Sequence, residues 1–120
     1  MTEARLSLGR LGEDLAVRHL EQRGFTILAR NHRTPVGELD IVARDRSHLL
    51  FIEVKTRRST AFGVPAEAVG ARKQRQIVRA AQWYLASRRF PDLQPRFDVI
   101  AVIAGRGEPA VTHIANAFGL

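Results

Sequence analysis

Acidic and basic side chains interrupt two apolar segments near the middle of the chain. Asp40 lies within Glu-Leu-Asp-Ile-Val-Ala, and Glu53 and Lys55 lie within Phe-Ile-Glu-Val-Lys. Because the side chains of a strand alternate between its two faces, a tight hairpin joining these segments would put all three on one side of a sheet. Neighbouring carboxylates repel each other and are costly to remove from water, so we expect a cation to compensate them. Lys55 is one candidate for that cation, and a divalent metal is the other.

The length of the hairpin loop decides how close the two acids lie. A two-residue loop at Arg46-Ser47 pairs Asp40 directly with Glu53. A four-residue loop over 44–47 would instead place them diagonally, within about 8 Å at Cα. Either spacing can hold a cation. The chain has no cysteine and no clustered histidine, so the oxygen ligands favour Mg²⁺ or Mn²⁺ over zinc.

A third acid is expected from an N-terminal helix over 7–23, where apolar residues recur at intervals of three and four. On this helix Glu13 lies on the small-residue flank of the apolar stripe, so it should point toward the sheet. Glycines at positions 9 and 12 would let the helix approach a neighbouring backbone. Such an approach would bring the Glu13 carboxylate near the two strands.

The chemistry that suits such a site is phosphodiester hydrolysis. A metal held by carboxylates withdraws charge from a phosphate and lowers the pKa of a bound water. An adjacent lysine can orient or deprotonate that water and neutralise charge in the transition state. All but two of the 19 basic residues are arginine, and the two lysines are Lys55 and Lys73. The protonation of a lysine can be tuned by burial, whereas a guanidinium stays protonated, so Lys55 has a physical reason to be lysine.

The remaining pattern predicts an α/β fold in which two helices pack on a mixed sheet. Gly24, followed by the apolar Phe25, should end the first helix with a left-handed cap. Trp83 and Tyr84 have core spacing on the second helix, and Asp98 is expected as a turn or capping residue at the start of an apolar strand covered on both faces. The predicted order is helix 7–23, strand 25–30, turn 31–37, strands 38–43 and 48–55, loop 56–70, helix 71–87, and strands 97–104 and 110–115.

The composition of the 120-residue chain predicts a single globular domain over 1–120. Without cysteine, disulfide frameworks, zinc ribbons, iron–sulfur clusters and thiol catalysis are excluded. No segment has the roughly 20 apolar residues of a membrane span, and the N-terminal residues lack the apolar stretch of a signal peptide, so we expect a cytoplasmic protein with no membrane partner. A net charge of +7 and a pI near 11.4 imply a positive field that would attract nucleic acid, acidic proteins or anionic lipid.

Three motifs together resemble those of the PD-(D/E)xK nuclease superfamily, whose fold is restriction-endonuclease-like. They are Gly-Glu-Leu-Asp at 37–40, Phe-Ile-Glu-Val-Lys-Thr-Arg at 51–57, and Gly-Glu at 12–13 in the N-terminal helix. From about Leu8 to Val102 the chain also resembles the small bacterial YraN-like family, which is similar to archaeal Holliday junction resolvases. Leu39 replaces the proline of the superfamily name, as in the resolvase-like members.

This resemblance implies a metal-dependent endonuclease that hydrolyses DNA phosphodiester bonds, with branched or junction DNA as a candidate substrate. Asp40 and Glu53 would hold Mg²⁺ or Mn²⁺, and Lys55 would be the catalytic lysine. Glu13 would be an additional acid at the metal or its water, and Glu38 would support the others. By analogy with junction cleavage, a homodimer would supply the two sites needed to cut two strands.

The resemblance also implies a surface that contacts the nucleic-acid backbone. Lys73 and Gln76 match a Lys-x-x-Gln helix motif that faces the substrate backbone in this kind of fold. Arginines beside the site would form a phosphate-binding rim. The rim residues that we expect are Arg57, Arg58, Arg72, Arg75 and Arg79.

Each assignment has a structural alternative. The acids and Lys55 are also compatible with an ion-pair ladder on an exposed sheet face, and Glu13 with a solvated carboxylate early in a helix. Lys73, Gln76 and the arginines are also compatible with an ordinary solvated face. For the whole protein, the alternative is a catalytically inactive nucleic-acid- or protein-binding adaptor on the same fold. A role in RNA processing is the third reading and predicts activity on structured RNA.

Overall fold

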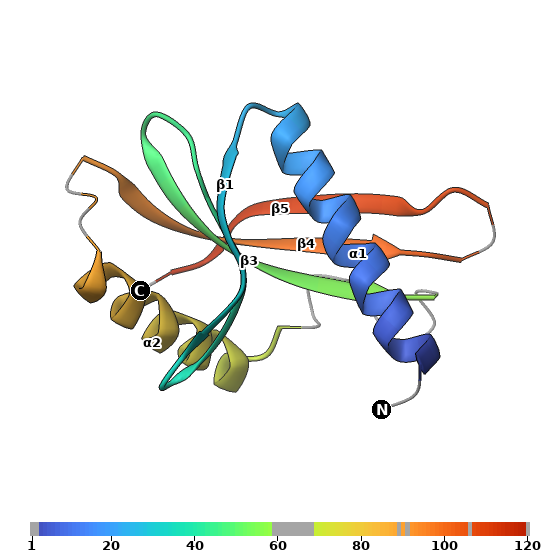
Figure 1. Cartoon of the computed structure of the whole chain (residues 1–120), viewed down its shortest axis with the longest axis horizontal. Helices are drawn as coiled ribbons and strands as arrows, with labels where there is room; N and C mark the ends of the chain where they lie inside the picture. Colours follow the sequence, from blue (N-terminus) through green and yellow to red (C-terminus); the bar gives the residue numbers. More distant parts are fainter. Residues whose placement is uncertain (1–2, 59–68, 89, 91, 106, 120) are drawn as a thin grey trace.

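The computed structural model describes residues 3–58, 69–88, 90, 92–105 and 107–119. The elements follow the predicted order of one helix, three strands, a second helix and two strands (Figure 1). They are α1 (Glu3–Gln22), β1 (Thr26–Thr34), β2 (Gly37–Arg44), β3 (His48–Arg57), α2 (Ala71–Ser87), β4 (Gln94–Ile103) and β5 (Ala110–Phe118).

The five strands form one mixed sheet in the order β1-β2-β3-β4-β5. β3 and β4 run parallel, and the other neighbouring strands run antiparallel. Parallel neighbours need a long crossover connection, and the segment that contains α2 provides it. The parallel pair is also the most buried part of the sheet, as the apolar run at 97–104 predicts. The fold is therefore the restriction-endonuclease-like α/β arrangement that the sequence predicts.

α1 and α2 cover opposite faces of this sheet, so the protein has two apolar cores. Leu20 of α1 packs in one core with Ile52 and Ile100, and Tyr84 of α2 packs in the other with Phe51. The adjacent residues Phe51 and Ile52 thus serve different cores, as the alternation of a strand requires. Neither helix, over its described residues, combines the length and apolar character needed to cross a membrane.

α1 ends in the cap that the sequence predicts. Gly24 has a φ of +89°. Its amide donates to the carbonyl oxygen of Glu21 at 3.1 Å, and the amide of Phe25 donates to that of Leu20 at 3.0 Å. These two bonds form a Schellman motif, which a glycine completes without backbone strain. Phe25 then packs against the α1 core, so the cap sets how the chain enters β1.

α1 contacts β3 directly at Gly12. A Cβ atom on Gly12 would lie 2.8 Å from both Cβ and Cγ2 of Thr56 and would overlap Thr56 Oγ1. Gly9 has a different role, because a Cβ atom there would meet no atom of the described residues within 4 Å. Of the two glycines that we predicted to allow a close approach, Gly12 is the one that does so.

Gly12→Ala is expected to destabilise the fold by about 1–3 kcal/mol, because the added methyl group overpacks the α1–β3 contact. The midpoint of urea unfolding should fall while the slope stays unchanged. Gly9→Ala is the matched control and should be neutral or slightly stabilising, since alanine favours a helix and the position has room for it. Equal midpoints for the two variants would contradict the close approach.

β1 runs further than we predicted from the sequence. We expected a turn from Asn31, but pairing with β2 continues to Thr34 opposite Gly37, which leaves only Pro35 and Val36 as the turn. Thr34 Oγ1 donates to the carbonyl oxygen of Gly37 at 2.7 Å and accepts the amide of Val36 at 3.2 Å. Pairing with a neighbouring strand therefore overrides the weak strand preference of this polar segment.

The connection between β3 and α2 also begins later than predicted, because β3 continues to Arg57. Residues 59–68 of the predicted loop lie outside the described residues. Val69 is buried in the α2 core, and Gly70 precedes the first turn of α2 with extended backbone angles.

Asp98 does not have the turn or capping role that we predicted. It lies in the middle of β4 and is fully buried. Arg96 donates to its two carboxylate oxygens at 2.9 and 2.8 Å, and Nε2 of His113 on β5 lies 2.7 Å from its Oδ2. The amide of Asn116 donates to Oδ1 at 3.0 Å. Asp98 is thus the centre of a buried polar cluster that joins β4 to β5.

The two aromatic residues predicted for the core of α2 differ in burial. Tyr84 is only 2% exposed, and its ring lies edge-on to Phe51 with centroids 5.9 Å apart. Trp83 is 39% exposed, so the predicted core role is wrong for this residue. Adjacent residues of a helix point about 100° apart, and only Tyr84 falls on the buried stripe.

Candidate active site

The hairpin of β2 and β3 has the shorter of the two predicted loops. The amide of Asp45 donates to the carbonyl oxygen of His48 at 3.1 Å, which leaves 46–47 as a two-residue loop. From there the strands pair residue by residue as far as Ile41 opposite Ile52. The next position on each strand carries an acid.

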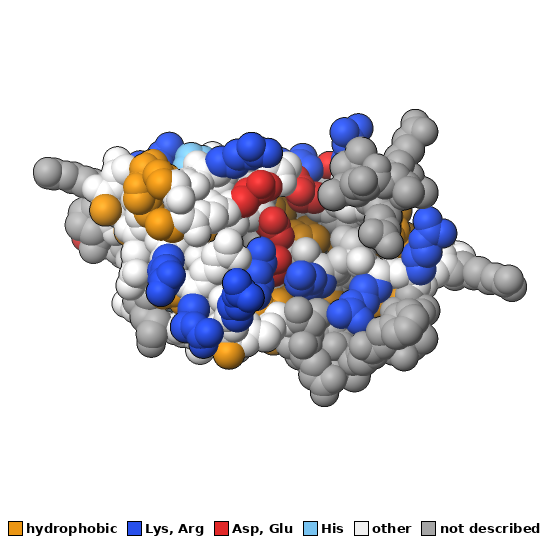
Figure 2. Space-filling model, turned by 90° about the horizontal axis from the view of Figure 1, so that it is seen from below, with side chains coloured by type: hydrophobic (Ala, Val, Ile, Leu, Met, Phe, Trp, Pro, Cys, Tyr) orange, Lys and Arg blue, Asp and Glu red, His pale blue; other side chains and the backbone are white. Residues whose placement is uncertain are grey.

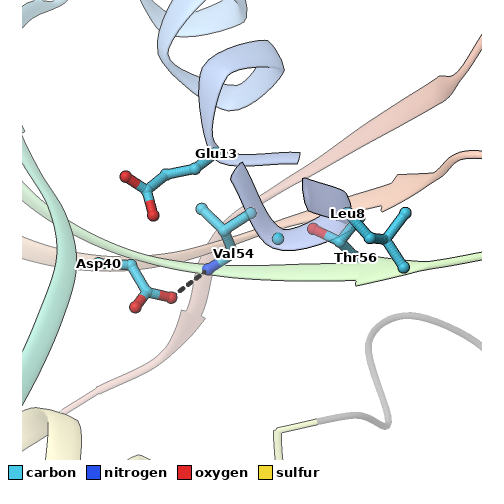
Figure 3. Close-up of a pocket in the computed structure, with 6 residues that line it drawn as sticks. Leu8, Glu13, Asp40, Val54 and Thr56 are labelled. Carbon is cyan, nitrogen blue, oxygen red and sulfur yellow. Dashed lines mark hydrogen bonds between the residues drawn. The ribbon is translucent and has the colours of Figure 1, made fainter. Parts of the chain in front are cut away.

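Asp40 and Glu53 are these two acids, and they lie where the backbone pairing of β2 and β3 stops. Asp40 Oδ2 accepts the amide of Val54 at 2.9 Å, in place of a backbone carbonyl (Figure 3). The side chain therefore ends the ladder, and its carboxylate is held at the point where the strands separate.

Glu53 is the buried acid of the site, with 7% of its side chain exposed. Burial and the charge of Asp40 raise the pKa of Glu53, and a hydrogen bond with Asp40 raises it further. The ammonium groups of Lys73 and Lys55 lower it. The net result is a pKa of about 7. A carboxyl group with so raised a pKa is typical of functional sites, where burial and neighbouring charges are arranged to shift titration. A ladder on an exposed face, the alternative from the sequence, does not fit so buried a side chain.

Both lysines of the chain contact this same carboxylate. Nζ of Lys55 lies 3.7 Å from Glu53 Oε1, and Nζ of Lys73, on α2, lies 3.9 Å from it. Lys73 is therefore not a purely solvent-side residue, although 40% of its side chain is exposed. Gln76, one turn further along α2, lies against the start of β2, since a Cβ atom on Gly37 would be 3.2 Å from Gln76 Cγ.

Glu13 points from α1 toward the sheet, as predicted, and β1 holds it there. Its Oε1 accepts a hydrogen bond from Asn31 Nδ2 at 2.8 Å and one from Arg30 Nε at 3.2 Å. Arg30 also donates to Asp14 Oδ1 at 2.6 Å, so one guanidinium contacts two acids of α1. The side chain of Glu13 is 15% exposed. It is not the freely solvated carboxylate of the alternative reading.

A cavity of about 440 Å³ lies between α1 and the ends of β2 and β3. Figure 3 shows the Glu13 carboxylate extending over this space toward Asp40. Glu13 and Asp40 thus line the same cavity, and Glu53 interacts with Asp40 without lining the cavity itself. Across the part of the chain that the structure describes, however, no three His, Cys, Asp or Glu side chains form a ready-made metal site. The residues that line the cavity are Leu8, Gly9, Glu13, Asp40, Val54 and Thr56.

Positive side chains flank the acids. Figure 2 shows a row of acidic side chains with Lys and Arg side chains on both sides of it. Arg72 is exposed on α2 beside Lys73, and Arg58 is exposed just after β3, while Arg57 is partly buried. Arg75 and Arg79 are exposed further along α2. Binding of phosphates by these arginines stays a prediction.

Glu38 lies beside the site on the exposed side of β2. Its Oε2 is 3.8 Å from Nε of Arg33 on β1, and 43% of its side chain is exposed. This contact is typical of a solvated strand residue, so the geometry favours Asp40 and Glu53 over Glu38 as functional acids of the site.

Our reading of the sequence missed the two residues that hold Glu13. Arg30 and Asn31 fall at the point where we predicted that the strand ends and a turn begins. Asn31 has a φ of +49°, which asparagine tolerates better than most residues. One feature of the sequence could have indicated these two residues. A polar run at 30–33 shortly precedes the Gly-Glu-Leu-Asp motif, and a longer hairpin would place this run beside the N-terminal helix.

Comparison with known proteins identifies the family of this chain. The model of the uncharacterised protein family UPF0102 matches residues 12–102. A UPF0102 protein of Syntrophotalea carbinolica is 64% identical over 118 residues, which are 98% of this chain and 96% of that protein. The UPF0102 protein of Geotalea daltonii is 50% identical over 115 residues, which are 95% of this chain and 91% of that protein. The UPF0102 protein of Desulfosudis oleivorans is 46% identical over 118 residues, which are 98% of this chain and 94% of that protein. The chain belongs to the UPF0102 family, the YraN-like and PD-(D/E)xK nuclease-like family that its motifs predict.

Proposed function

We propose that this protein is an endonuclease of the cytoplasm that depends on Mg²⁺ or Mn²⁺ and hydrolyses phosphodiester bonds of DNA. The observation that carries the proposal is the convergence of Asp40, Glu53 and both lysines of the chain at one place. Two acids held together against their repulsion, with amines beside them, suit metal-assisted hydrolysis of a phosphodiester. The nuclease-like motifs of the family support the same chemistry.

The side chains fit a hard divalent cation. Asp40 and Glu53 offer carboxylate oxygens, and Mg²⁺ in proteins is usually held by one or two carboxylates, with water and substrate phosphate oxygens as its other ligands. Glu13 would be the additional acid near the ion or its water. When bound, the ion would withdraw charge from the phosphate and lower the pKa of a water molecule.

The two lysines would act on the phosphate and the attacking water. Lys55 Nζ, 3.7 Å from Glu53, would orient that water or neutralise charge that develops on the phosphate oxygens. Lys73, from α2, would add a second positive charge on the same side as Gln76. Because an ammonium carries three donors on a flexible stem, it can contact an acid and then a phosphate with little rearrangement.

In this proposal DNA binds along the basic rim together with Lys73 and Gln76. A protein of net charge +7 attracts DNA, and contacts to phosphates make the affinity fall with rising salt concentration. The likeness to junction resolvases favours branched or junction DNA over a plain duplex. A homodimer would bring two sites to such a substrate.

With Mn²⁺ present, the wild-type protein should cut single-stranded, duplex or four-way-junction DNA, and Lys55→Met should reduce the rate by about 10²- to 10³-fold. Methionine keeps the apolar stem of lysine but removes the charge that stabilises the transition state. The measurement is a gel assay on end-labelled DNA, with EDTA as the metal-free control. Arg46→Ala removes a positive charge in the hairpin loop and should leave the rate unchanged. Equal cleavage by Lys55→Met and wild type would contradict the proposed site.

The second candidate is a DNA- or protein-binding adaptor without nuclease activity. It is favoured by the balance of charge at Glu53, where two ammonium groups already compensate the acids, and by the lack of a three-ligand metal set among the described residues. This candidate predicts DNA binding without cleavage at any divalent ion. An RNA-processing enzyme would instead cut structured RNA in the same assay.

A further inference from the structure

One exposed face of α2, its outer face, carries two arginines and ends in an exposed aromatic residue. Arg72, Gln76, Arg79 and Trp83 follow one another at intervals of four, three and four residues, which puts them on one face of the helix. All four are exposed. The helix contains no acidic residue, and within the described residues no ion pair neutralises Arg72 or Arg79. The face is therefore an uncompensated positive stripe.

Trp83 is exposed at the end of this stripe, although the apolar core lies one residue away at Tyr84. Its exposed fraction is 39%, against 2% for Tyr84. An indole ring is a flat surface on which any base can stack, and basic grooves combined with such aromatic residues are how proteins bind single strands without reading their sequence. In a duplex the faces of the bases are covered by their neighbours, so only an unpaired base can use this ring.

The spacing of Lys73 and Trp83 along α2 sets the length of strand that can join them. Trp83 lies ten positions beyond Lys73 on the same helix, which corresponds to about 15 Å along the axis. At about 3.4 Å per stacked nucleotide, this distance corresponds to about four nucleotides.

We infer that the outer face of α2 binds a single-stranded segment of DNA, with Trp83 stacking on an unpaired base. The choice of DNA and the spacing rest on the proposed function, because the phosphate next to Lys73 is taken as the one that is cut. The stacked base then lies about four nucleotides from that phosphate. The substrate class is accordingly DNA with an unpaired segment, such as a flap, a splayed arm or an open junction.

Trp83 is the only tryptophan of the chain, so its fluorescence reports on this face alone. The wild-type protein in EDTA is titrated with a 12-nucleotide oligo-dT and, separately, with a blunt hairpin duplex of equal charge. The oligo-dT should quench the fluorescence to saturation, whereas the duplex should quench it weakly. Equal quenching by the two DNA molecules would overturn the inference.

Variants test the same contact through the anisotropy of a labelled oligo-dT. Trp83→Ala should weaken binding by about 5- to 150-fold, the range of one base–aromatic stack, and Trp83→Phe should retain most of the affinity. Arg79→Ala should lower the slope of log affinity against log salt by about 0.7. Arg18→Ala, on the exposed side of α1, is the control and should bind as wild type does. Thermal melting checks that each variant is folded, and wild-type affinity for a folded Trp83→Ala would overturn the inference.

These measurements separate the inference from the proposed function because they need neither metal nor cleavage. Selective quenching by oligo-dT in a protein that never cuts DNA would support the α2 face and contradict the nuclease. Cleavage that is lost in Lys55→Met, combined with unchanged oligo-dT binding by Trp83→Ala, would support the nuclease and contradict the α2 face.

Discussion

Glu53→Gln should make the protein more stable than the wild type at pH 8 and unable to cleave DNA. Burial and the charge of Asp40 raise the pKa of Glu53 from an ordinary value of 4.5 to about 7, even with both lysines beside it. The folded state therefore holds a proton between about pH 4.5 and 7 that the unfolded chain releases. Stability must fall as the pH rises through that window.

The size of the effect follows from the same shift. About two and a half pKa units correspond to up to about 3 kcal/mol at pH 8. Glutamine is neutral at every pH, so the variant does not lose stability as the pH rises. The difference in the free energy of unfolding between Glu53→Gln and the wild type should therefore grow from near zero at pH 4 to its full value at pH 8. The measurement is urea unfolding of both proteins at pH 4, 6 and 8. Glu21→Gln, exposed on α1, is the control, and a stability difference for Glu53→Gln that does not change with pH would contradict the raised pKa.

The loss of activity in Glu53→Gln has a separate cause. An amide oxygen carries no charge with which to hold a divalent ion, and Lys55 and Lys73 lose the anion that they contact. We expect cleavage to fall by at least 10²-fold under the conditions in which the wild type cuts DNA. A variant that is more stable and inactive would show that the acid is kept for function at a cost to the fold.

Asp98→Asn should destabilise the fold by about 3–5 kcal/mol at pH 7, because it leaves the charge of Arg96 without its buried partner. Burial alone would raise the pKa of Asp98, but hydrogen bonds from His113, Arg96 and the amide of Asn116 lower it to about 2. Asparagine cannot accept from all these donors, since one of its two side-chain positions is itself a donor.

The pH dependence of stability tests whether the charge of Asp98 causes the destabilisation in Asp98→Asn. Because the folded-state pKa of Asp98 is below the ordinary value of 3.8, its contribution is complete above about pH 4 and is lost as the pH falls toward 2. The gap between wild type and Asp98→Asn in urea unfolding should therefore be widest at neutral pH and narrow below pH 4. Asp92→Asn changes an exposed acid and should show no gap. A change below 1 kcal/mol for Asp98→Asn would contradict the structural role of the cluster.

The parts of the structure that the sequence predicts are those determined by local pattern. The alternation of apolar and polar residues around Asp40 and Glu53, with a short polar loop between them, was enough to predict one hairpin with both acids on the same side of it. The helix cap at Gly24 is equally local, since it depends on a glycine followed by an apolar residue. These features needed no knowledge of distant segments.

The parts that the sequence did not predict depend on contacts between distant segments. Asp98 looked like a capping residue because its partner His113 lies on another strand, and only the register of β4 against β5 brings them together. The role of Asn31 depends in the same way on α1 packing beside β1. The family motif related Lys73 to the substrate backbone and not to Glu53, because 13 residues separate its helix from β3 and a periodic pattern does not describe the path of such a connection.

The convergence of Lys55 and Lys73 on Glu53 also determines where amine-directed reagents can react. A protein with many surface lysines would be acylated at scattered positions, whereas here every side-chain amine belongs to the acid pair. Apart from reaction at the α-amino group, labelling with a primary-amine reagent therefore reports on this one site, and a ligand that shields the two ammonium groups would protect Lys55 and Lys73 from the label.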